Sequence, residues 1–404
     1  MPSQIIQERL NAKILTVQSS QDILKRLQRR LYTDRFPLVL WGGLRILTLI
    51  WAIIAISVLP VRSLSLAGDP PRVPPTGWDI LIEPWARWDT LWYLRIAARG
   101  YSTTDLTGGF FPLYPLLIRG LSFVIPNPLL CALIISTLAT LGAALVFYRL
   151  AQDCLGEMTA RRALLYWLLF PTSFYFLGGY AESLCVLMTL LSLRAARQGR
   201  WGWAGLAGAF AALARPPGFL ILVPLGIEWL QARGSTYERV RRAAPLTLVP
   251  IALALYMLYL YWQFNDPFFW LNAWHNVTIM PWDMAFKTLQ FILAGVALPN
   301  NLIDFSFTVL VLGLTGIGIR RIPLSLTAFA FALILVQMMA YPPGLGFVET
   351  PMEGFARRAA FVFPAFLVLA QVWRGRLKEP LWIGVSLIIQ LTFISIFVCW
   401  LWLA

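Results

Sequence analysis

Long apolar segments alternate with short polar, arginine-bearing segments along almost the whole chain. Eleven of the apolar segments are candidate membrane spans, although several are shorter than the roughly 20 residues that a straight spanning helix needs. Their ranges are 36–59, 128–150, 160–178, 181–197, 201–214, 216–232, 244–263, 302–319, 323–341, 357–373 and 380–402. The pattern predicts an all-α polytopic membrane protein with about 11 transmembrane helices.

The composition supports this class. Hydrophobic residues make up 59% of the 404 residues and charged residues 13%, far from the values of soluble proteins. The first long apolar run starts near Phe36 and is long enough to cross a bilayer, so we expect a span rather than a cleavable signal peptide. Residues 286–299 are apolar but short, and a re-entrant or interfacial segment is the alternative to a span. The cysteines lie singly in or beside apolar segments and are expected to be core residues: Cys131, Cys154, Cys185 and Cys399.

The net charge of +14 would suggest a nucleic-acid partner in a soluble protein. Whether it does so here depends on how the charges are distributed along the chain. When the chain is threaded through the predicted spans with its N-terminus inside, 22 of the 33 basic residues but only 8 of the 19 acidic residues fall on the inner side. This is the asymmetry of the positive-inside rule. The net charge is therefore expected to be almost wholly cytoplasmic, and no nucleic acid is needed to explain it.

Two regions are expected along the chain. Residues 1–35 carry apolar residues at helical spacing and seven basic residues, which predicts a cytoplasmic amphipathic helix on anionic lipid, with a solvated tail as the alternative. Residues 36–404 form one membrane domain without an internal repeat or a separate soluble domain. Its larger outer segments are 60–127, 264–301 and 342–356. Since 60–127 is too long for a mere connection, we expect the chemistry on the outer face.

The segment 85–121 within the first outer loop is rich in aromatic residues, and the aspartate Asp89 lies among them in its first part. In a helix that begins at Trp85, the 100° step per residue places Asp89 among aromatic side chains. The residues on that side are Trp85, Trp88, Asp89, Trp92, Tyr93 and Ile96, whereas Arg87 and Leu91 point away. Such aromatic residues favour the membrane interface, so we expect this helix to lie along the membrane surface and to end at Gly100. The prolines of residues 110–115 prevent a regular continuous helix there.

Three blocks of sequence resemble a known family. The run R-W-D-x-x-W-Y-L-x-I-A-x-x-G-Y, followed by F-F-P-L-Y-P-L-L, is similar to the signature of the PIG-V family, the GPI second-mannose transferases and their prokaryotic relatives. Residues 170–218 contain F-P-T-S-F-Y-F, Y-A-E-S-L and A-L-A-R-P-P-G, and residues 357–366 contain R-x-x-x-x-x-F-P. The resemblance covers most of residues 36–374. It implies a GT-C fold, a large first extracytoplasmic loop with interfacial helices, and use of a lipid-phosphate sugar.

Asp89 is the expected catalytic residue. The resemblance implies this role, because GT-C enzymes carry an acidic residue in the first outer loop, and a carboxylate can take the proton of an attacking hydroxyl as a general base. A helix-surface charge is the alternative reading. Glu182, at the outer mouth of a span, is expected to position the acceptor, to pair with an arginine or to orient other groups, with a charge favoured by the helix dipole as the alternative.

Arginines on the outer side are candidate phosphate-binding residues, because a guanidinium group matches phosphate oxygens. Arg215, Arg357 and Arg358 depart from the otherwise clean sidedness of the charges. Snorkelling toward lipid headgroups is the alternative. Arg87 flanks Asp89 and is expected to bind substrate or to tune the aspartate.

The remaining candidate substrate contacts are a histidine and several aromatic residues. His275 is the only histidine, so no zinc cluster is expected, and it either contacts acceptor hydroxyls or has a structural role. The aromatic candidates for stacking on a sugar or lining a lipid groove are Trp88, Tyr93, Phe111, Tyr114 and Tyr180. Packing in a membrane belt is the alternative for each. We expect no metal and no cofactor.

The resemblance implies an inverting mannosyltransferase. It would move mannose from a polyprenyl- or dolichyl-phosphate carrier to a hydroxyl of a glycolipid or glycan at the extracytoplasmic face. The membrane would be the cell membrane in a prokaryote and the endoplasmic reticulum membrane in a eukaryote. The alternatives are a transporter or flippase of lipid-linked sugars, a silent subunit of a glycosylation complex, and a GT-C transferase for another sugar or a protein acceptor. A transporter usually shows paired repeats with broken helices, and the sequence shows neither.

Overall fold

The structure is a computed structural model that describes residues 34–62, 77–272, 277–278, 280–341, 351–352 and 354–401. The expected amphipathic helix at 1–35 lies almost wholly outside these residues, and so does His275.

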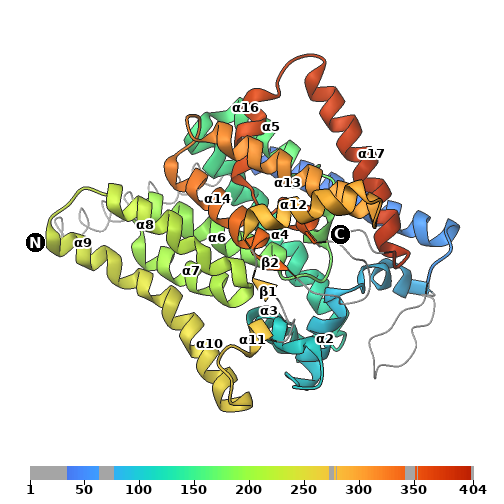
Figure 1. Ribbon diagram of the computed structural model, residues 1–404, viewed down its shortest axis with the longest axis horizontal. Coiled ribbons are helices and arrows are strands. Elements are labelled where there is room, and N and C mark those ends of the chain that lie inside the picture. The colour runs from blue at the N-terminus through green and yellow to red at the C-terminus, as the bar shows by residue number, and fades with distance from the viewer. Residues whose placement is uncertain are drawn as a thin grey trace, which may run out of the picture.

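The described chain is almost entirely helical (Figure 1). A long first helix, Asp34–Val58, is followed by α2 (Asp89–Arg99), α3 (Leu113–Ser122), α4 (Pro128–Leu155), α5 (Glu157–Leu168), α6 (Glu182–Arg197), α7 (Trp201–Ala214), α8 (Leu222–Gln231), α9 (Thr236–Ala243), α10 (Leu248–Phe264), α11 (Phe269–Asn272), α12 (Pro281–Leu293), α13 (Leu298–Gly318), α14 (Leu324–Met338), α15 (Phe355–Ala359), α16 (Pro364–Val372) and α17 (Lys378–Val398). Short 3₁₀ helices are η1 (Gly77–Leu81), η2 (Glu83–Trp85), η3 (Leu106–Gly109), η4 (Ser173–Leu177), η5 (Pro216–Ile221) and η6 (Ala244–Thr247). The strands β1 (Val277–Thr278) and β2 (Ala340–Tyr341) pair antiparallel, with Val277 opposite Tyr341.

Five helical segments of the described chain are long and apolar enough to cross a membrane. They are Asp34–Val58, Pro128–Leu155, Thr236–Phe264, Leu298–Gly318 and Lys378–Val398, and the shorter apolar helices are Trp201–Ala214 and Leu324–Met338. The all-helical class with several apolar helices is therefore confirmed, whereas the count of eleven spans stays a prediction.

Some predicted spans are not single helices. The segment 160–178 divides into α5 and η4, because the helix ends at Leu168, shortly before a proline at position 171. The segment 357–373 divides into α15 and α16, and the latter begins with Pro364. The hydroxyl of Thr172, at the first break, donates to the carbonyl oxygen of Ala356 in α15, so the two broken segments are in contact.

The helix of the first outer loop begins later than predicted. It starts at Asp89 rather than at Trp85, because Trp88 has a φ of 47° and interrupts the helix. Its end at Gly100, with a φ of 81°, agrees with the prediction. Arg87 and Leu91, which were predicted to point away, are both buried, with exposed fractions of 2% and 4%.

The second half of that loop is also more regular than predicted. Helix α3 begins at Leu113, immediately after Pro112, and holds Pro115 in its first turn, where a missing N–H costs little. The prolines therefore limit the irregular backbone to the residues before Leu113.

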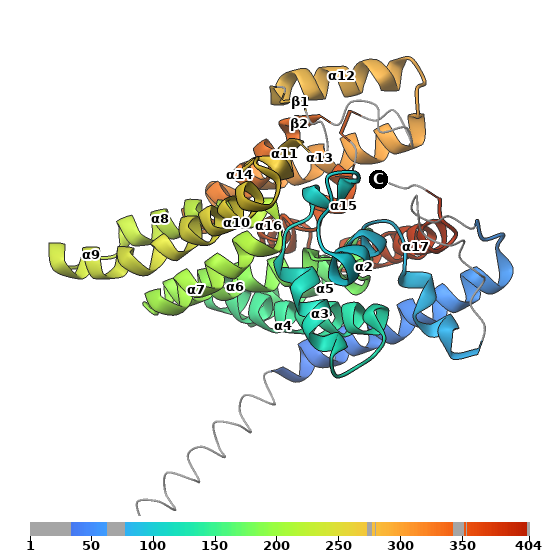
Figure 2. The same cartoon turned by 90° about the horizontal axis from the view of Figure 1, so that it is seen from below.

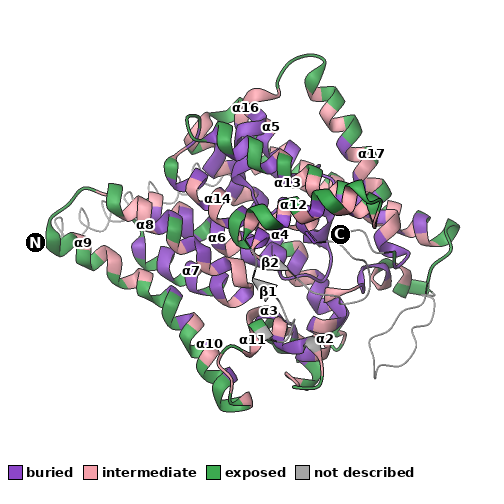
Figure 3. Cartoon of the chain, in the orientation of Figure 1, coloured by how far each residue is buried: buried purple, intermediate pink, exposed green. Residues whose placement is uncertain are grey.

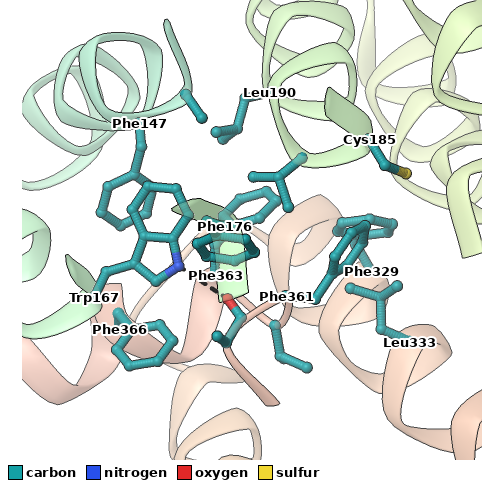
Figure 4. Close-up of a cluster of buried hydrophobic side chains, with 14 of the residues drawn as sticks. Phe147, Trp167, Phe176, Cys185, Leu190, Phe329, Leu333, Phe361, Phe363 and Phe366 are labelled. Carbon is teal, nitrogen blue, oxygen red and sulfur yellow. Dashed lines mark hydrogen bonds between the residues drawn. The ribbon is translucent and has the colours of Figure 1, made fainter. Parts of the chain in front are cut away.

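The core lies where α4, α5, α6 and α16 meet (Figure 3). Trp167 is at its centre, with its ring centroid 4.8 Å from that of Phe147 and 5.6 Å from that of Phe176 (Figure 4). The indole Nε1 donates to the carbonyl oxygen of Ala360 at 2.9 Å, so the buried N–H is satisfied.

The outer helices expose large apolar side chains instead. Trp262 on α10 is 82% exposed and Ile388 on α17 is 68% exposed. Exposure of this kind on long apolar helices is expected where lipid replaces water as the solvent.

Candidate active site

Four charged side chains form one connected series with alternating sign. Nη1 of Arg215 lies 2.6 Å from Oε1 of Glu182, and Nε of Arg357 lies 3.6 Å from the same oxygen. Nη1 of Arg357 also donates to Oδ2 of Asp89 at 3.0 Å. We call Asp89, Glu182, Arg215 and Arg357 the charge quartet. Its members come from four segments and cover all three blocks of the sequence motif, since Glu182 and Arg215 both belong to the second block.

The quartet is sheltered but not closed. The Glu182 side chain is 2% exposed, whereas those of Asp89, Arg215 and Arg357 are 14 to 15% exposed. A buried ion loses hydration and must be compensated by partners, and two carboxylates with two guanidinium groups give no net charge. Three of the four groups therefore remain within reach of a ligand, while Glu182 lies behind them.

Close packing of two helix starts brings the two carboxylates near each other. Asp89 is the first residue of α2 and Glu182 the first residue of α6. Gly179 lies just before α6, and a Cβ added to it would come within 2.5 Å of Cγ2 of Thr90. The absence of a side chain at Gly179 thus allows the start of α2 to approach the start of α6.

Arg215 follows the end of α7 in an extended conformation, with φ of −157° and ψ of 155°. The proline after it favours this conformation, which directs the chain away from the helix axis. At Gly218, an added Cβ would lie 1.8 Å from the carbonyl oxygen of Ala211, so only glycine allows the chain to fold back against α7.

Arg357 lies in the short helix α15, which is fixed by buried polar contacts. Oδ1 of Asp304, a residue of α13 with an exposed fraction of 0%, accepts a hydrogen bond from the backbone N–H of Ala356 at 2.7 Å. The hydroxyl of Thr172 donates to the carbonyl oxygen of Ala356 at 2.8 Å. Asp304 is not among the predicted site residues, although an acidic residue within the apolar run 302–319 is a signal for a functional or structural role.

Tyrosines surround the quartet. The guanidinium carbon of Arg357 lies 5.7 Å from the ring centroid of Tyr175 and 5.6 Å from that of Tyr180, within cation–π range. Burial raises the pKa of Tyr93 well above its ordinary value, Arg215 lowers it, and the carboxylates of Glu182 and Asp89 raise it further. Tyr93 is therefore a neutral hydroxyl beside the quartet.

Arg87, one of the predicted substrate contacts, is engaged elsewhere. Its guanidinium donates to the carbonyl oxygens of Val398 at 3.0 Å and Glu83 at 2.7 Å, and it lies 4.8 Å from the ring of Trp400. These contacts fix the turn before α2 against the end of α17. The hydrogen bonds of Arg87 named above thus go to backbone oxygens outside the quartet.

Two of the predicted tyrosines differ in their position relative to the quartet. Tyr180 lies beside Arg357 and donates its hydroxyl to the carbonyl oxygen of Arg87 at 3.2 Å. Tyr114 donates to the carbonyl oxygen of Ala132 at 2.9 Å, inside the core.

Three further predicted residues pack against neighbouring elements. The ring of Phe111 contacts Tyr256 and Trp270, and that of Trp88 contacts Trp400. Nε of Arg358 donates to the carbonyl oxygen of Gly354 at 3.0 Å.

The chemistry of the donor set does not suit a divalent cation. One oxygen of each carboxylate of the quartet is paired with an arginine, so its negative charge is already partly compensated. In the described part of the chain, no group of three or more histidine, cysteine and acidic residues is placed to bind a metal ion.

The quartet thus lies in a helical chain with several apolar segments long enough to cross a membrane, where charged side chains are costly unless they are paired or functional. The family model of the mannosyltransferases (PIG-V) matches residues 41–271, more than half of the chain, and the chain belongs to this family. The resemblance found in the sequence is thus confirmed.

Solved structures of ArnT from Cupriavidus metallidurans are also similar. The apo structure has a TM-score of 0.48 at 16% identity, over 86% of this chain and 62% of that chain. The structure bound to undecaprenyl phosphate has a TM-score of 0.45 at 13% identity, over 86% of this chain and 60% of that chain. The chain thus spans less than two thirds of the ArnT chains. No curated protein matches it.

Proposed function

We propose that the protein is an inverting mannosyltransferase with the quartet as its active site. The donor is mannose on a polyprenyl or dolichyl phosphate, and the acceptor is a hydroxyl of a glycolipid or glycan. The observation that carries the proposal is the ion pair of Asp89 with Arg357, which unites a potential base and a potential phosphate ligand in one partly accessible cluster.

Asp89 acts as the general base. Its carboxylate takes the proton of the acceptor hydroxyl as the oxygen attacks C1 of the sugar from the face opposite the phosphate. The new bond joins C1 to the acceptor oxygen, the bond between C1 and the phosphate oxygen breaks, and its electron pair leaves on the polyprenyl phosphate. Attack from the opposite face inverts the configuration at C1, and the proton remains on Asp89.

Arg357 and Arg215 bind the donor phosphate. In the structure Arg357 is paired with Asp89, which leaves that oxygen of the carboxylate occupied. A donor phosphate competes with Asp89 for the guanidinium, and its arrival frees the carboxylate to accept a proton. The guanidinium then neutralises the charge that develops on the leaving phosphate. Donor binding and activation of the base are thereby coupled.

Glu182 is a positioning residue. One of its oxygens contacts both arginines, at 2.6 Å and 3.6 Å, so the carboxylate holds the two cations together against their mutual repulsion. Tyr175 and Tyr180 flank Arg357 and limit its movement. Asp304 positions Arg357 indirectly, because its carboxylate accepts a hydrogen bond from the backbone of α15.

We place the quartet on the outer face because of the distribution of the basic residues. When the chain is threaded through the predicted spans, the basic clusters fall on the opposite side, which the positive-inside rule identifies as cytoplasmic. Residues 36–404 form the catalytic membrane domain, with 60–127, 264–301 and 342–356 as its outer segments, and residues 1–35 form the cytoplasmic amphipathic segment. The membrane is the cell membrane in a prokaryote or the endoplasmic reticulum membrane in a eukaryote.

The test is sugar transfer by the purified protein in lipid vesicles. Radiolabelled polyprenyl-phosphate mannose is supplied with a total lipid extract, and the same donor with other sugars is run in parallel. Labelled product that disappears in Asp89→Asn, but persists in Asp79→Asn, supports the proposal, since Asp79 is an exposed aspartate of the same loop. No product with any sugar, together with movement of lipid-linked sugar across the vesicle membrane, would favour the transporter instead.

A further inference from the structure

A cavity of about 600 Å³ lies away from the quartet, between the end of α6, the start of α7, α8 and α9. Helix α6 connects the two regions, because it begins with Glu182 of the quartet and ends with Arg197, which lines the cavity. At 1.5 Å per residue, its 16 residues separate them by about 22 Å. Figure 2 shows α9 at the end of the molecule away from α2 and α15.

The lining of the cavity is strongly cationic. Four arginines line it, Arg197, Arg233, Arg241 and Arg242, with Glu228 as the acidic residue among them. The carboxylate of Glu228 is already engaged, since its Oε1 lies 3.4 Å from Nη1 of Arg197 and accepts from the hydroxyl of Ser325 at 2.5 Å. The acid within the cavity therefore does not balance the charge of α9.

The acidic residue of α9, Glu238, is also engaged by groups of the chain itself. Oε2 of Glu238 accepts from the backbone N–H of Ser235 at 3.0 Å, as part of the capping box that starts the helix. The same oxygen lies 4.0 Å from Arg242. Within the described residues, Arg233 and Arg241 form no ion pair with any carboxylate. Two guanidinium groups at the cavity are thus available to an anion from outside the chain.

Exposed apolar side chains adjoin this cationic cavity. Tyr237 and Val240 on α9 are 74% and 63% exposed, and Leu230 at the end of α8 is 62% exposed. A helix with exposed apolar residues beside arginines is typical of the headgroup level of a membrane, where anionic lipids gather. The cavity is therefore positioned to meet the phosphate of a lipid headgroup.

We infer that this cavity is a binding site for a phosphate ester, with an anionic phospholipid as its source. The guanidinium groups of Arg233 and Arg241 bind the phosphate oxygens, and the apolar surface of α8 and α9 contacts the acyl chains. The site is separate from the quartet and anchors the end of the membrane domain that carries the arginine clusters.

The test measures lipid binding without any sugar donor, so it is independent of the proposed transferase activity. The full chain in a neutral detergent is titrated with dioctanoyl phosphatidylglycerol, dioctanoyl phosphatidylcholine or glycerol phosphate, and bound molecules are counted by native mass spectrometry. We expect phosphatidylglycerol to bind more tightly than phosphatidylcholine, and Arg233→Gln with Arg241→Gln to weaken that binding about tenfold.

A matched double variant, Arg320→Gln with Arg321→Gln, removes the same charge from an exposed turn outside the cavity. It should retain full binding. If glycerol phosphate binds and displaces phosphatidylglycerol, the cavity also binds soluble phosphate esters. If glycerol phosphate does not displace the lipid, the cavity is specific for phospholipid. Equal loss in both double variants, or binding that does not distinguish phosphatidylglycerol from phosphatidylcholine, would overturn the inference. Because Arg233 and Arg241 are exposed, the double variant that replaces them should unfold at the same temperature as the unchanged protein when no ligand is present. An unchanged unfolding temperature shows that weaker lipid binding is not due to misfolding.

Discussion

Arg357 donates a hydrogen bond of 3.0 Å to Asp89, across 268 positions of the sequence. The contact joins the first residue of α2 to the short helix α15, and Glu182 and Arg215 extend it into a connected series of charges. This ion pair brings the first and third motif blocks of the sequence together. It also has direct consequences for activity and stability.

Replacement of the base should abolish transfer without unfolding the protein. Asp89→Asn retains the size of the side chain but cannot accept the proton, and we expect kcat to fall by about 10²- to 10⁴-fold. Affinity for the donor should be retained, because Arg357 is then free to bind phosphate. Initial rates over a range of donor concentrations measure both quantities. Unchanged kcat in Asp89→Asn would rule out this residue as the base.

Arg357 should not be replaceable by lysine. Lys keeps the positive charge but offers no planar pair of donors for phosphate, so we expect Arg357→Lys to lower kcat/KM about ten- to hundredfold. The control is Arg358→Lys, because the neighbouring guanidinium contacts the backbone of Gly354 rather than the quartet. Equal losses in the two variants would place the phosphate site elsewhere.

The quartet predicts a specific pattern of stability. Glu182→Gln leaves Arg215 without its buried partner, and breaking a buried pair costs about 3 to 5 kcal/mol. The double variant Glu182→Gln with Arg215→Met removes that pair together and leaves Asp89 and Arg357 paired and neutral. We expect the double variant to regain much of the lost stability without regaining activity. Unfolding in detergent, followed by circular dichroism, compares the two, and additive losses would show that the pair is not coupled.

The close approach of α2 and α6 can be tested at Gly179. An added Cβ would meet Thr90 at 2.5 Å, so Gly179→Ala should destabilise the protein by about 1 to 3 kcal/mol and reduce transfer by displacing Asp89. Gly120→Ala in α3 is the control, because nothing lies within 4 Å of the added atom. Thr90→Ala should partly rescue Gly179→Ala, and a Gly179→Ala enzyme with normal activity would contradict this account.

Stability at high pH should report on Tyr93. Burial raises the pKa of this phenol well above its ordinary value of 10.0, so the folded protein retains a proton that the unfolded chain loses. The resulting stability is complete below about pH 10 and is lost as the pH rises beyond that value. Tyr93→Phe cannot lose this proton and should therefore show a shallower decline of the unfolding free energy with pH above 10. Parallel declines would mean that Tyr93 ionises freely in the folded protein.

Much of the candidate site can be predicted from the sequence because charges are costly in an apolar chain. Four residues stand out as ionisable groups at the ends of apolar segments or within the sequence motifs: Asp89, Glu182, Arg215 and Arg357. Their pairing could not be predicted, since it depends on contacts between four distant segments. Asp304 itself carries a signal in the sequence, as an acidic residue in an apolar run, but its hydrogen bond to the backbone N–H of Ala356 could not be predicted, because a backbone contact between two helices has no signature in sequence.

The sequence by itself determined the all-helical class, the apolar helices and the end of α2 at Gly100, because hydrophobic periodicity and glycine conformations act locally. It did not determine where α2 begins. That start depends on Trp88, whose φ of 47° is compatible with its packing against Trp400, and on Arg87, which binds the carbonyl oxygen of Val398. Only the tertiary structure decided the start of α2 and the pairing of Asp89 with Arg357, because both depend on groups that lie more than 250 residues further along the chain.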